Sequence, residues 1–131
     1  MTISAARQGI YDRLSDTYNR VHKFVPDKIE TSPTEPVIII GAPDGTGPTT
    51  QDTAAEYTLT FPVILLVSRA ESERGQDRLD GYMLDVAELL DDDLDGAVSS
   101  CLFTGFQNYT GTYTIGGTDY IGVTLTFEIF A

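Results

Sequence analysis

Residues 57–67 read YTLTFPVILLV, a stretch in which apolar and polar side chains first alternate and then give way to a wholly apolar run. Successive side chains of a β-strand point to opposite faces of the sheet, so alternate positions share one face. One face of this stretch is apolar throughout, through Tyr57, Leu59, Phe61, Val63, Leu65 and Val67. The pattern predicts a long strand, and because Pro62 has no N–H to donate, we expect a free edge or a bulge beside it.

A second strand is predicted upstream of this stretch, at residues 37–40. These residues read VIII and are followed by Gly41, and a short β-branched run of this kind is typical of a strand that is covered on both faces or pressed against a neighbour. The residues between the two strands are turn formers with no apolar anchor beyond Ala42 and Pro43. We therefore expect a long surface loop there, and long loops are often functional.

The C-terminal part of the chain has the composition of a pleated sheet. After Asp95 only Asp119 and Glu128 carry charge, while Thr, Tyr, Gly and β-branched residues are frequent. Residues 115–118 read IGGT, which predicts a two-glycine hairpin turn, and residues 121–129 alternate strictly between apolar and polar or small residues. This segment therefore predicts two or three strands, the last with one apolar and one polar face.

Two segments carry the three- and four-residue apolar spacing of an amphipathic helix. The first begins at Ile3 after the N-cap candidate Thr2, and its apolar positions recur as far as Val21. The second has apolar residues at Leu79, Tyr82, Met83, Val86, Leu89 and Leu90. Negative charge is unfavourable at the C-terminal end of a helix dipole, so residues 91–93, which read DDD, predict that this helix stops near Leu90.

The predicted element order is helix, strand, strand, helix, strand, strand. This order favours an α+β fold, with the two helices packed on one face of a mostly antiparallel four-stranded sheet. The chain of 131 residues is long enough to bury a core and fits one domain, residues 1–131. A hydrophobic content of 41% argues against a disordered acidic chain.

The charge balance is strongly acidic. Twenty Asp and Glu residues against eight Lys and Arg residues give a net charge of −12, and no Lys or Arg follows Arg78. Proteins that bind nucleic-acid backbones neutralise phosphates with basic side chains, so this composition argues against direct DNA binding. Residues 1–7 lack the apolar core of a signal peptide, and the longest apolar runs are too short to span a bilayer, so we expect neither secretion nor membrane insertion.

Two motifs suggest ligand binding but are incomplete. Residues 91–96 place Asp at alternate positions before a Gly, as at the start of an EF-hand calcium loop, but Leu102 occupies the position that needs a bidentate carboxylate. A solvated acidic helix end is the simpler interpretation. Residues 41–47 are rich in Gly but lack the Lys and the following helix of a phosphate-binding loop. We therefore predict neither a metal site nor a nucleotide site.

His22 and Cys101 are the single residues of their types. A catalytic triad or a zinc site would need partners that the sequence hardly contains, so we interpret His22 as an exposed residue at a helix end. Cys101 lies in an apolar stretch of strand type and is interpreted as a buried structural thiol of a protein from a reducing compartment. Carboxylate pairs such as Asp77 and Asp80 have no feature that singles them out. We expect no enzyme and no cofactor.

Several short segments follow one another along the whole chain in a specific order and spacing. They are an N-terminal helix of this type, then residues 24–27 (FVPD), 36–43 (PVIIIGAP), 57–63 (YTLTFPV), 76–80 (QDRLD), 95–98 (DGAV), 108–109 (NY), 113–120 (YTIGGTDY) and 127–129 (FEI). In this arrangement the chain resembles the tail terminator proteins of long-tailed bacteriophages, which are also called minor tail proteins. The resemblance covers essentially the full chain.

The resemblance implies a structural virion protein. Similar proteins form a hexameric ring at the head-proximal end of the tail, assembled in the cytoplasm of the host bacterium. The ring caps the finished tail tube, stops its growth and provides the surface to which the head is joined. The implied partners are further copies of the chain, the major tail tube protein and the head–tail connector proteins. Genome DNA would pass through the ring without specific binding, and no membrane is involved.

Two alternatives remain open. The nearest is a head–tail connector or adaptor protein, which would share the helix-and-sheet plan and differ in its first partner. The alternative from another class is a small acidic binding module, with or without calcium at Asp91, Asp93 and Asp95. Calcium binding to a site of three aspartates would release heat. It would also raise the melting temperature of the protein, because a ligand that binds the folded state stabilises that state.

Two surfaces are candidates for assembly contacts. The polar face of the last strand, through Thr124, Thr126 and Glu128, is expected to line the pore or to meet a neighbouring subunit, with plain solvent exposure as the alternative. The loop is expected to contact the tube or the connector, because its length and its lack of apolar anchors suit a segment that orders on assembly. The loop residues are Asp44, Gly45, Thr46, Gly47, Pro48, Thr49, Thr50, Gln51, Asp52 and Thr53.

Overall fold

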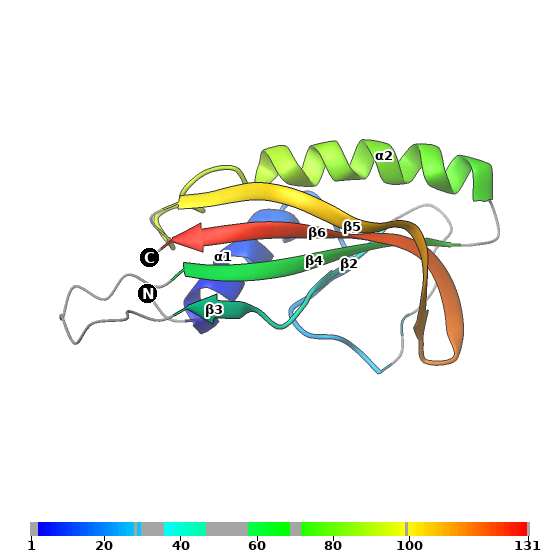
Figure 1. The fold of residues 1–131 in the computed structure, drawn as a ribbon, viewed down its shortest axis with the longest axis horizontal. Helices are drawn as coiled ribbons and strands as arrows, with labels where there is room; N and C mark the ends of the chain where they lie inside the picture. Colours follow the sequence, from blue (N-terminus) through cyan, green and yellow to red (C-terminus); the bar gives the residue numbers. More distant parts are fainter. Residues whose placement is uncertain are drawn as a thin grey trace.

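The computed structural model of the chain describes residues 3–27, 29, 36–46, 58–68, 72–98 and 100–130. Within these residues the architecture is α+β, with two helices and one mixed sheet of six strands (Figure 1). In chain order the elements are α1 (Ile3–Ser15), β1 (Val21–His22), β2 (Val37–Ile40), β3 (Asp44–Thr46), β4 (Thr58–Ser68), α2 (Ser72–Leu89), β5 (Ser100–Ile115) and β6 (Thr118–Phe130).

The strand order is β1-β2-β4-β6-β5, and β3 pairs with β4. The β1–β2 pair is parallel, and the other pairs that the structure describes are antiparallel. The predicted α+β class is confirmed, but the prediction of a four-stranded sheet is wrong in the number of strands. The predicted strands correspond to β2, β4, β5 and β6, and the two short strands β1 and β3 are additional.

Strand β1 lies where the sequence predicts the end of the first helix. Helix α1 ends at Ser15, and the N–H of Tyr18 closes its last turn by donating to the carbonyl of Leu14 at 2.8 Å. The chain then runs beside β2, where Val21 pairs with Ile38. Tyr18 is buried and Val21 packs against the same core. These apolar side chains are therefore buried against the sheet, although the helix that their spacing predicts has already ended.

Strand β3 lies at the start of the predicted long loop. Asp44 pairs with Thr60 of β4 and Thr46 pairs with Thr58, in antiparallel register. Strand β4 extends beyond the end of β2, and its backbone donors and acceptors there need partners, which β3 supplies. This pairing outweighs the turn-like composition of residues 44–46. The other predicted loop residues, 47–53, lie outside the described residues.

Strand β4 is the central strand, and it pairs with β6 over its whole length. On its opposite edge the carbonyl of Pro62 accepts a hydrogen bond from the N–H of Gly41 at 2.8 Å. The N and the carbonyl of one strand residue point toward the same neighbour, so the missing donor of Pro62 also faces this side. The chain leaves the β4 edge there, between Ile40 of β2 and Asp44 of β3. The sequence predicts a free edge or a bulge beside Pro62, and the structure has an irregularity there: four steps from Ile40 to Asp44 face three steps from Val63 to Thr60.

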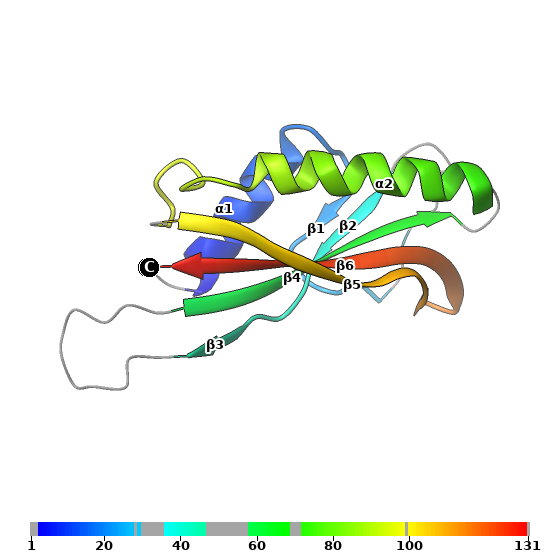
Figure 2. The same cartoon turned by 45° about the horizontal axis from the view of Figure 1, so that its top comes forward.

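Both helices pack on the same face of the sheet (Figure 2). The helices contribute Ala6, Ile10, Leu14, Leu79 and Val86 to one buried core. Alternate residues of β2, β4 and β6 form the other side of this core, and these are Ile38, Ile40, Leu59, Phe61, Val63, Leu65, Val67, Ile121, Val123, Leu125, Phe127 and Ile129. Tyr18, Leu90, Leu94, Val98 and Cys101 of β5 are also buried in it. Over the described residues, the apolar faces predicted for 57–67 and 121–129 are therefore the faces beneath the helices, and Tyr57 lies outside the described residues.

A smaller buried cluster lies on the opposite face of the sheet. It consists of Ile29, Val37, Ile39, Leu66 and Tyr120. This cluster explains why β2 reads as a continuous apolar run, since both of its faces are covered. It involves only one end of β4 and of β6, and the rest of this face carries the half-buried polar residues of the two strands.

The ends of α2 and of the last hairpin follow local sequence. Helix α2 begins at Ser72, earlier than its first predicted apolar residue, and ends at Leu89, beside the predicted stop at Leu90. Gly116 and Gly117 have φ angles of 60° and 80°, which confirms the predicted glycine turn between β5 and β6. In the described ranges, neither helix is long and apolar enough to cross a bilayer.

We expect Gly122→Ala to weaken the pairing of β4 with β6. A Cβ at Gly122 would lie 2.5 Å from the carbonyl oxygen of Leu65 and 2.7 Å from Cδ2 of Leu66, so the neighbouring backbone would have to move. The free energy of unfolding, measured by urea denaturation, should fall by about 1 to 3 kcal/mol, the range for overpacked cores.

The matched control is Gly81→Ala in the exposed interior of α2, where a Cβ meets nothing within 4 Å. This substitution should raise stability by about 0.5 to 1 kcal/mol. Equal effects of the two substitutions would contradict the close contact at Gly122.

Candidate assembly surfaces

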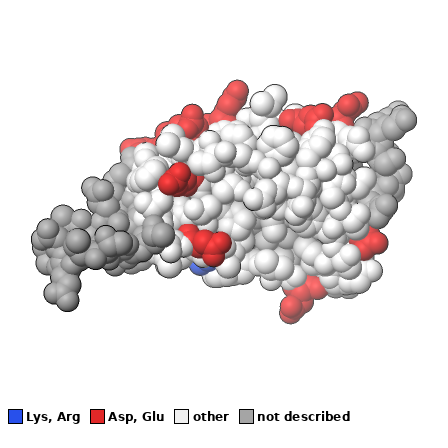
Figure 3. Space-filling view, viewed as in Figure 1, with Lys and Arg blue, Asp and Glu red and all other residues white. Residues whose placement is uncertain are grey.

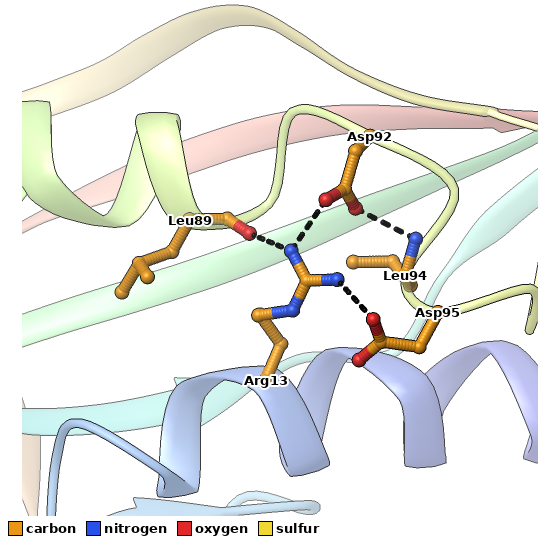
Figure 4. Close-up of polar contacts among 5 residues, drawn as sticks. All are labelled: Arg13, Leu89, Asp92, Leu94 and Asp95. Carbon is orange, nitrogen blue, oxygen red and sulfur yellow. Dashed lines mark hydrogen bonds and ion pairs between the residues drawn. The ribbon is translucent and has the colours of Figure 1, made fainter.

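Arg13 links the two helices at the point where α2 ends (Figure 4). It lies in the last turn of α1, and its side chain is 17% exposed. Its guanidinium donates to the carbonyl of Leu89 at 2.8 Å and to a carboxylate oxygen of Asp92 at 2.6 Å, and it lies 3.1 Å from an oxygen of Asp95. The second oxygen of Asp92 accepts the N–H of Leu94 at 2.7 Å. One side chain thus ties two carboxylates to the last carbonyl of the helix.

These contacts relieve an electrostatic conflict. The C-terminal end of a helix carries partial negative charge and leaves carbonyls without partners, and residues 91–93 add three carboxylates there. Arg13 supplies both a positive charge and a donor. The hydrogen bond from Arg13, with a smaller contribution from the N–H of Leu94, lowers the pKa of Asp92 below its usual value. The role of Arg13 cannot be found from the sequence, because Arg13 lies 79 residues from Asp92 and no local pattern connects them.

The acidic segment does not have the arrangement of the calcium alternative. The carboxylates that converge are those of Asp92 and Asp95, and they converge on Arg13. Asp91 and Asp93 are exposed. Over the described part of the chain, no group of three or more His, Cys, Asp or Glu side chains is placed to hold a metal ion. The positive partner of this acidic segment is therefore a guanidinium of the same chain.

Tyr18 makes a second link to α2. Its hydroxyl donates to a carboxylate oxygen of Asp85, and its ring meets that of Tyr82 edge to face, with 6.0 Å between ring centroids. Burial raises the pKa of Tyr18, and the hydrogen bond to Asp85 raises it further. Together with Arg13, this contact holds α2 against the segment that leads from α1 to β1.

Cys101 and His22, which the sequence singles out, lie in structural settings. Cys101 is buried opposite Ile129 of β6, which confirms the predicted buried thiol. Burial, assisted by nearby carboxylates, raises the pKa of Cys101 to about 12, so the thiol stays protonated at neutral pH. His22 lies half-buried in β1, and the prediction of an exposed helix end is wrong because the helix stops earlier. Burial lowers the pKa of His22.

The predicted polar face of the last strand lies on the side of the sheet that the helices leave uncovered. Thr124, Thr126 and Glu128 alternate with the core residues of β6 and are half-buried. They stand beside Ile64, Pro62 and Thr60 of β4. The hydroxyl of Thr124 shares a 2.6 Å hydrogen bond with the hydroxyl of Tyr113 on β5. These residues form a pleated surface that is mostly neutral, with the carboxylate of Glu128 toward one end.

The space-filling view shows how charge is distributed over the side of the molecule drawn in Figure 1 (Figure 3). Asp and Glu side chains lie mainly along its margins, above all along the margin formed by α2, and broad areas between them carry no charge. Burying a charged group in an interface is expensive unless it finds a partner. An uncharged area can therefore contact another protein without the cost of burying unpaired charges.

Exposed large apolar side chains gather at two edges of the molecule. One group lies on β5 and on the neighbouring α2, and comprises Leu84, Leu102, Phe103, Phe106 and Tyr109. The other lies on α1 and after β1, and comprises Ile3, Phe24 and Val25. Clustered apolar side chains mark interaction surfaces, whereas isolated ones are ordinary. The sequence does not reveal a role for these side chains, because a strand pattern does not show which strand the helices leave uncovered.

Comparison with known proteins adds no family assignment. No protein-family model matches the chain, and no curated protein matches it. The exposure, charge and position of each surface are therefore the available guides to its role.

The Arg13–Asp92 pair should make part of the stability depend on pH. The pKa of Asp92 is lower in the folded chain than in the unfolded chain, so its contribution is fully present above about pH 4 and is lost as the pH falls through the lower, folded value. Because the pair is partly exposed, Asp92→Asn should lower the free energy of unfolding by up to about 1 kcal/mol at pH 7. Urea denaturation at pH 7, 5 and 3 measures this difference, which should shrink below about pH 4. The control is Asp93→Asn, since Asp93 is exposed. A loss at pH 3 as large as that at pH 7 would rule out the pair as its source.

Cys101 should react slowly with thiol reagents in the folded protein. Its side chain is buried and its pKa is raised to about 12, so both access and thiolate formation are suppressed. Absorbance of a disulfide reagent should show little reaction under native conditions and full reaction in urea. The control is Thr104→Cys at an exposed position of the same strand, which should react at once without denaturant. Fast native labelling of the wild-type protein would show that the thiol is accessible.

Proposed function

We propose that this chain is a tail terminator of a long-tailed phage. It is a structural virion protein that caps the tail tube as a hexameric ring, ends tube growth and provides the head-joining surface. The observation that carries this proposal is the one-sided cover of the sheet. Both helices pack on one face, and the other face presents Thr124, Thr126 and Glu128. A ring subunit needs several contact surfaces of this kind, because it meets neighbours, a tube and a connector at once.

The segments that carry the sequence resemblance supply the framework of the fold. Residues 36–43 contain β2, residues 57–63 contain the first half of β4, and residues 76–80 lie in α2. Residues 113–120 form the hairpin that joins β5 to β6. The segments on which the resemblance rests thus belong to the strands of the sheet and to a helix that covers it. This supports the proposal that the chain has the same architecture as the tail terminator family.

The charge supports passage of DNA through a ring. Six copies would carry a formal charge of about −72, six times the −12 of one chain, and this charge has the sign of the DNA backbone. DNA binding needs basic groups that replace counterions, and residues 79–131 contain no Lys or Arg. A ring of this composition would let the genome pass without holding it.

The proposed partners follow from the surfaces. Thr124, Thr126 and Glu128 line the pore or meet a neighbouring copy. Residues 44–53 contact the tube protein or the head–tail connector, and Asp44 and Gly45 at the start of this segment are exposed on β3. The protein acts without a catalytic step or a cofactor, at the head-proximal end of the tail, after assembly in the host cytoplasm.

Electron microscopy of particles from a phage that lacks this protein tests the proposal. We expect tails longer than normal and without heads, because nothing ends tube growth or provides the joining surface. Supplying the wild-type chain, or the Gly81→Ala variant as a matched control, should restore tail length and joining. Tails of normal length that stay unjoined would instead indicate a head–tail connector. Normal, joined particles would contradict both roles and leave the acidic binding module, for which calcium titration by calorimetry is the next measurement.

A further inference from the structure

Strand β5 ends the sheet, and exposed aromatic side chains follow its helix-side face. Phe103 and Phe106 are 38% and 54% exposed. They lie opposite Phe127 and Leu125 of β6, whose side chains belong to the core beneath the helices. Opposite residues of antiparallel strands share a face, so Phe103 and Phe106 lie on the helix side as well. Helix α2 packs on β4 and β6, and the β5 end of this face stays open to solvent.

A bulge at residues 108–110 shapes this aromatic row. Asn108 and Thr110 have φ angles of 54° and 58°, a conformation that is uncommon for residues other than glycine and more strained for a β-branched one. Between them, Tyr109 reaches α2, where its hydroxyl donates to a carboxylate oxygen of Asp80. Bulges interrupt the regular backbone edge that another strand would need for pairing. This edge therefore favours docking through side chains over addition of a strand.

Carboxylates border the aromatic row. Asp80 accepts the hydrogen bond from Tyr109, and Leu84, which is 70% exposed, lies one helical turn further along α2. The hydrogen bond to Asp80 raises the pKa of Tyr109. Asp77 lies three residues before Asp80 in α2, on the same side of the helix. The ring of Tyr109 meets that of Phe106 with 6.0 Å between centroids. We call this surface the aromatic edge, and it comprises Asp77, Asp80, Leu84, Phe103, Phe106 and Tyr109.

The opposite end of the strand order carries a second exposed apolar group. Phe24 and Val25, which follow β1, are 64% and 61% exposed. Here the neighbouring charges are positive, since the guanidinium of Arg7 lies 4.6 Å from the centre of the Phe24 ring and Lys23 precedes that residue. Ile3, which is 48% exposed, lies one helical turn before Arg7. We call this surface the basic edge, and it comprises Ile3, Arg7, Lys23, Phe24 and Val25.

The two edges are complementary in charge. The basic edge contains Arg7 and Lys23, and the exposed Asp27 lies two residues beyond it. The aromatic edge contains Asp77 and Asp80 with Arg78 between them, and residues 79–130 hold nine carboxylates and no basic residue. Contact between opposite charges orients two proteins and fixes their register, and the apolar centres supply burial. Contact between two aromatic edges would bring carboxylates together, and contact between two basic edges would bring cations together. Both contacts are unfavourable, because like charges repel each other.

We infer that each copy docks its aromatic edge against the basic edge of the next copy. This inference rests on the proposed ring and names the surfaces that build it. The edges lie at opposite ends of the strand order, β5 at one end and β1 at the other. The contact is therefore head to tail. A dimer held by this contact still has one free aromatic edge and one free basic edge, so further copies can add until the ring closes.

Thiol cross-linking between the edges tests the docking. A chain with both Phe106→Cys and Val25→Cys, concentrated as the purified full-length protein, is treated with a short bifunctional maleimide. We expect a ladder of multimers that ends in a closed species. Each single variant should give no cross-linked species, and an equimolar mixture of the two should give dimers only. The wild-type protein is the control for Cys101, which is buried.

Charge exchange provides an independent measurement. Asp80→Lys or Lys23→Glu alone should weaken self-association about tenfold or more, because like charges then face each other. The two substitutions in one chain should restore it, since every contact again pairs opposite charges. Asp93→Lys is the matched control, because Asp93 is exposed but lies beyond the end of α2 and outside both edges.

The outcomes separate this docking from the proposed function. Cross-linking of Phe106→Cys alone would show that two aromatic edges meet, and would overturn the inference. Rings or tail caps seen by microscopy without cross-links between the edges would also overturn it, with the aromatic edge then facing the tube or connector, and would leave the terminator role intact. Cross-linked rings from a protein whose loss leaves tails normal would support the docking and contradict the terminator role. Absence of cross-links both in the concentrated protein and on assembled tails would refute the docking.

Discussion

The antiparallel pairing of β4 with β6 holds the other elements in place. The two strands run side by side along the whole of β4, and both turn their apolar faces toward the helices. Helix α2 packs on this pair, β2 and β3 share the outer edge of β4, and β5 pairs with the other edge of β6, to which a hairpin joins it. The places of α2, β2, β3 and β5, and of the surfaces that they carry, therefore depend on this strand pair.

The scarcity of basic residues makes the place of each one important. The chain has eight Lys and Arg residues against twenty Asp and Glu residues, so most carboxylates have no cation available to them. Arg13 is placed where the need is greatest, at the helix end that three successive aspartates follow. Arg7 and Lys23 lie over aromatic rings at the N-terminal side. Residues 79–131 contain no basic residue, so the C-terminal part of the chain is strongly acidic.

The proposed assembly surfaces arise from a mismatch between the sheet and its cover. Two helices cover one face of the sheet but stop short of β5, so aromatic residues there stay exposed. The other face has only a small apolar cluster near β2, and its remaining part is polar but nearly neutral. Both features leave area that a neighbouring protein can bury. A protein that works inside a larger assembly would use such areas, because its fold is completed by contacts with other subunits.

The sequence by itself determined the α+β class, the long strands, the glycine hairpin, the stop of α2 and the buried thiol. These features follow from spacings of two or of three to four residues and from local turn chemistry, which act between neighbours in the chain. Only the tertiary structure decided that Val21 and His22 leave the helix for β1, that residues 44–46 pair with β4, and that Arg13 meets Asp92. It also decided which apolar residues remain exposed. These outcomes depend on which distant segments meet, and a pattern of neighbours carries no information about that.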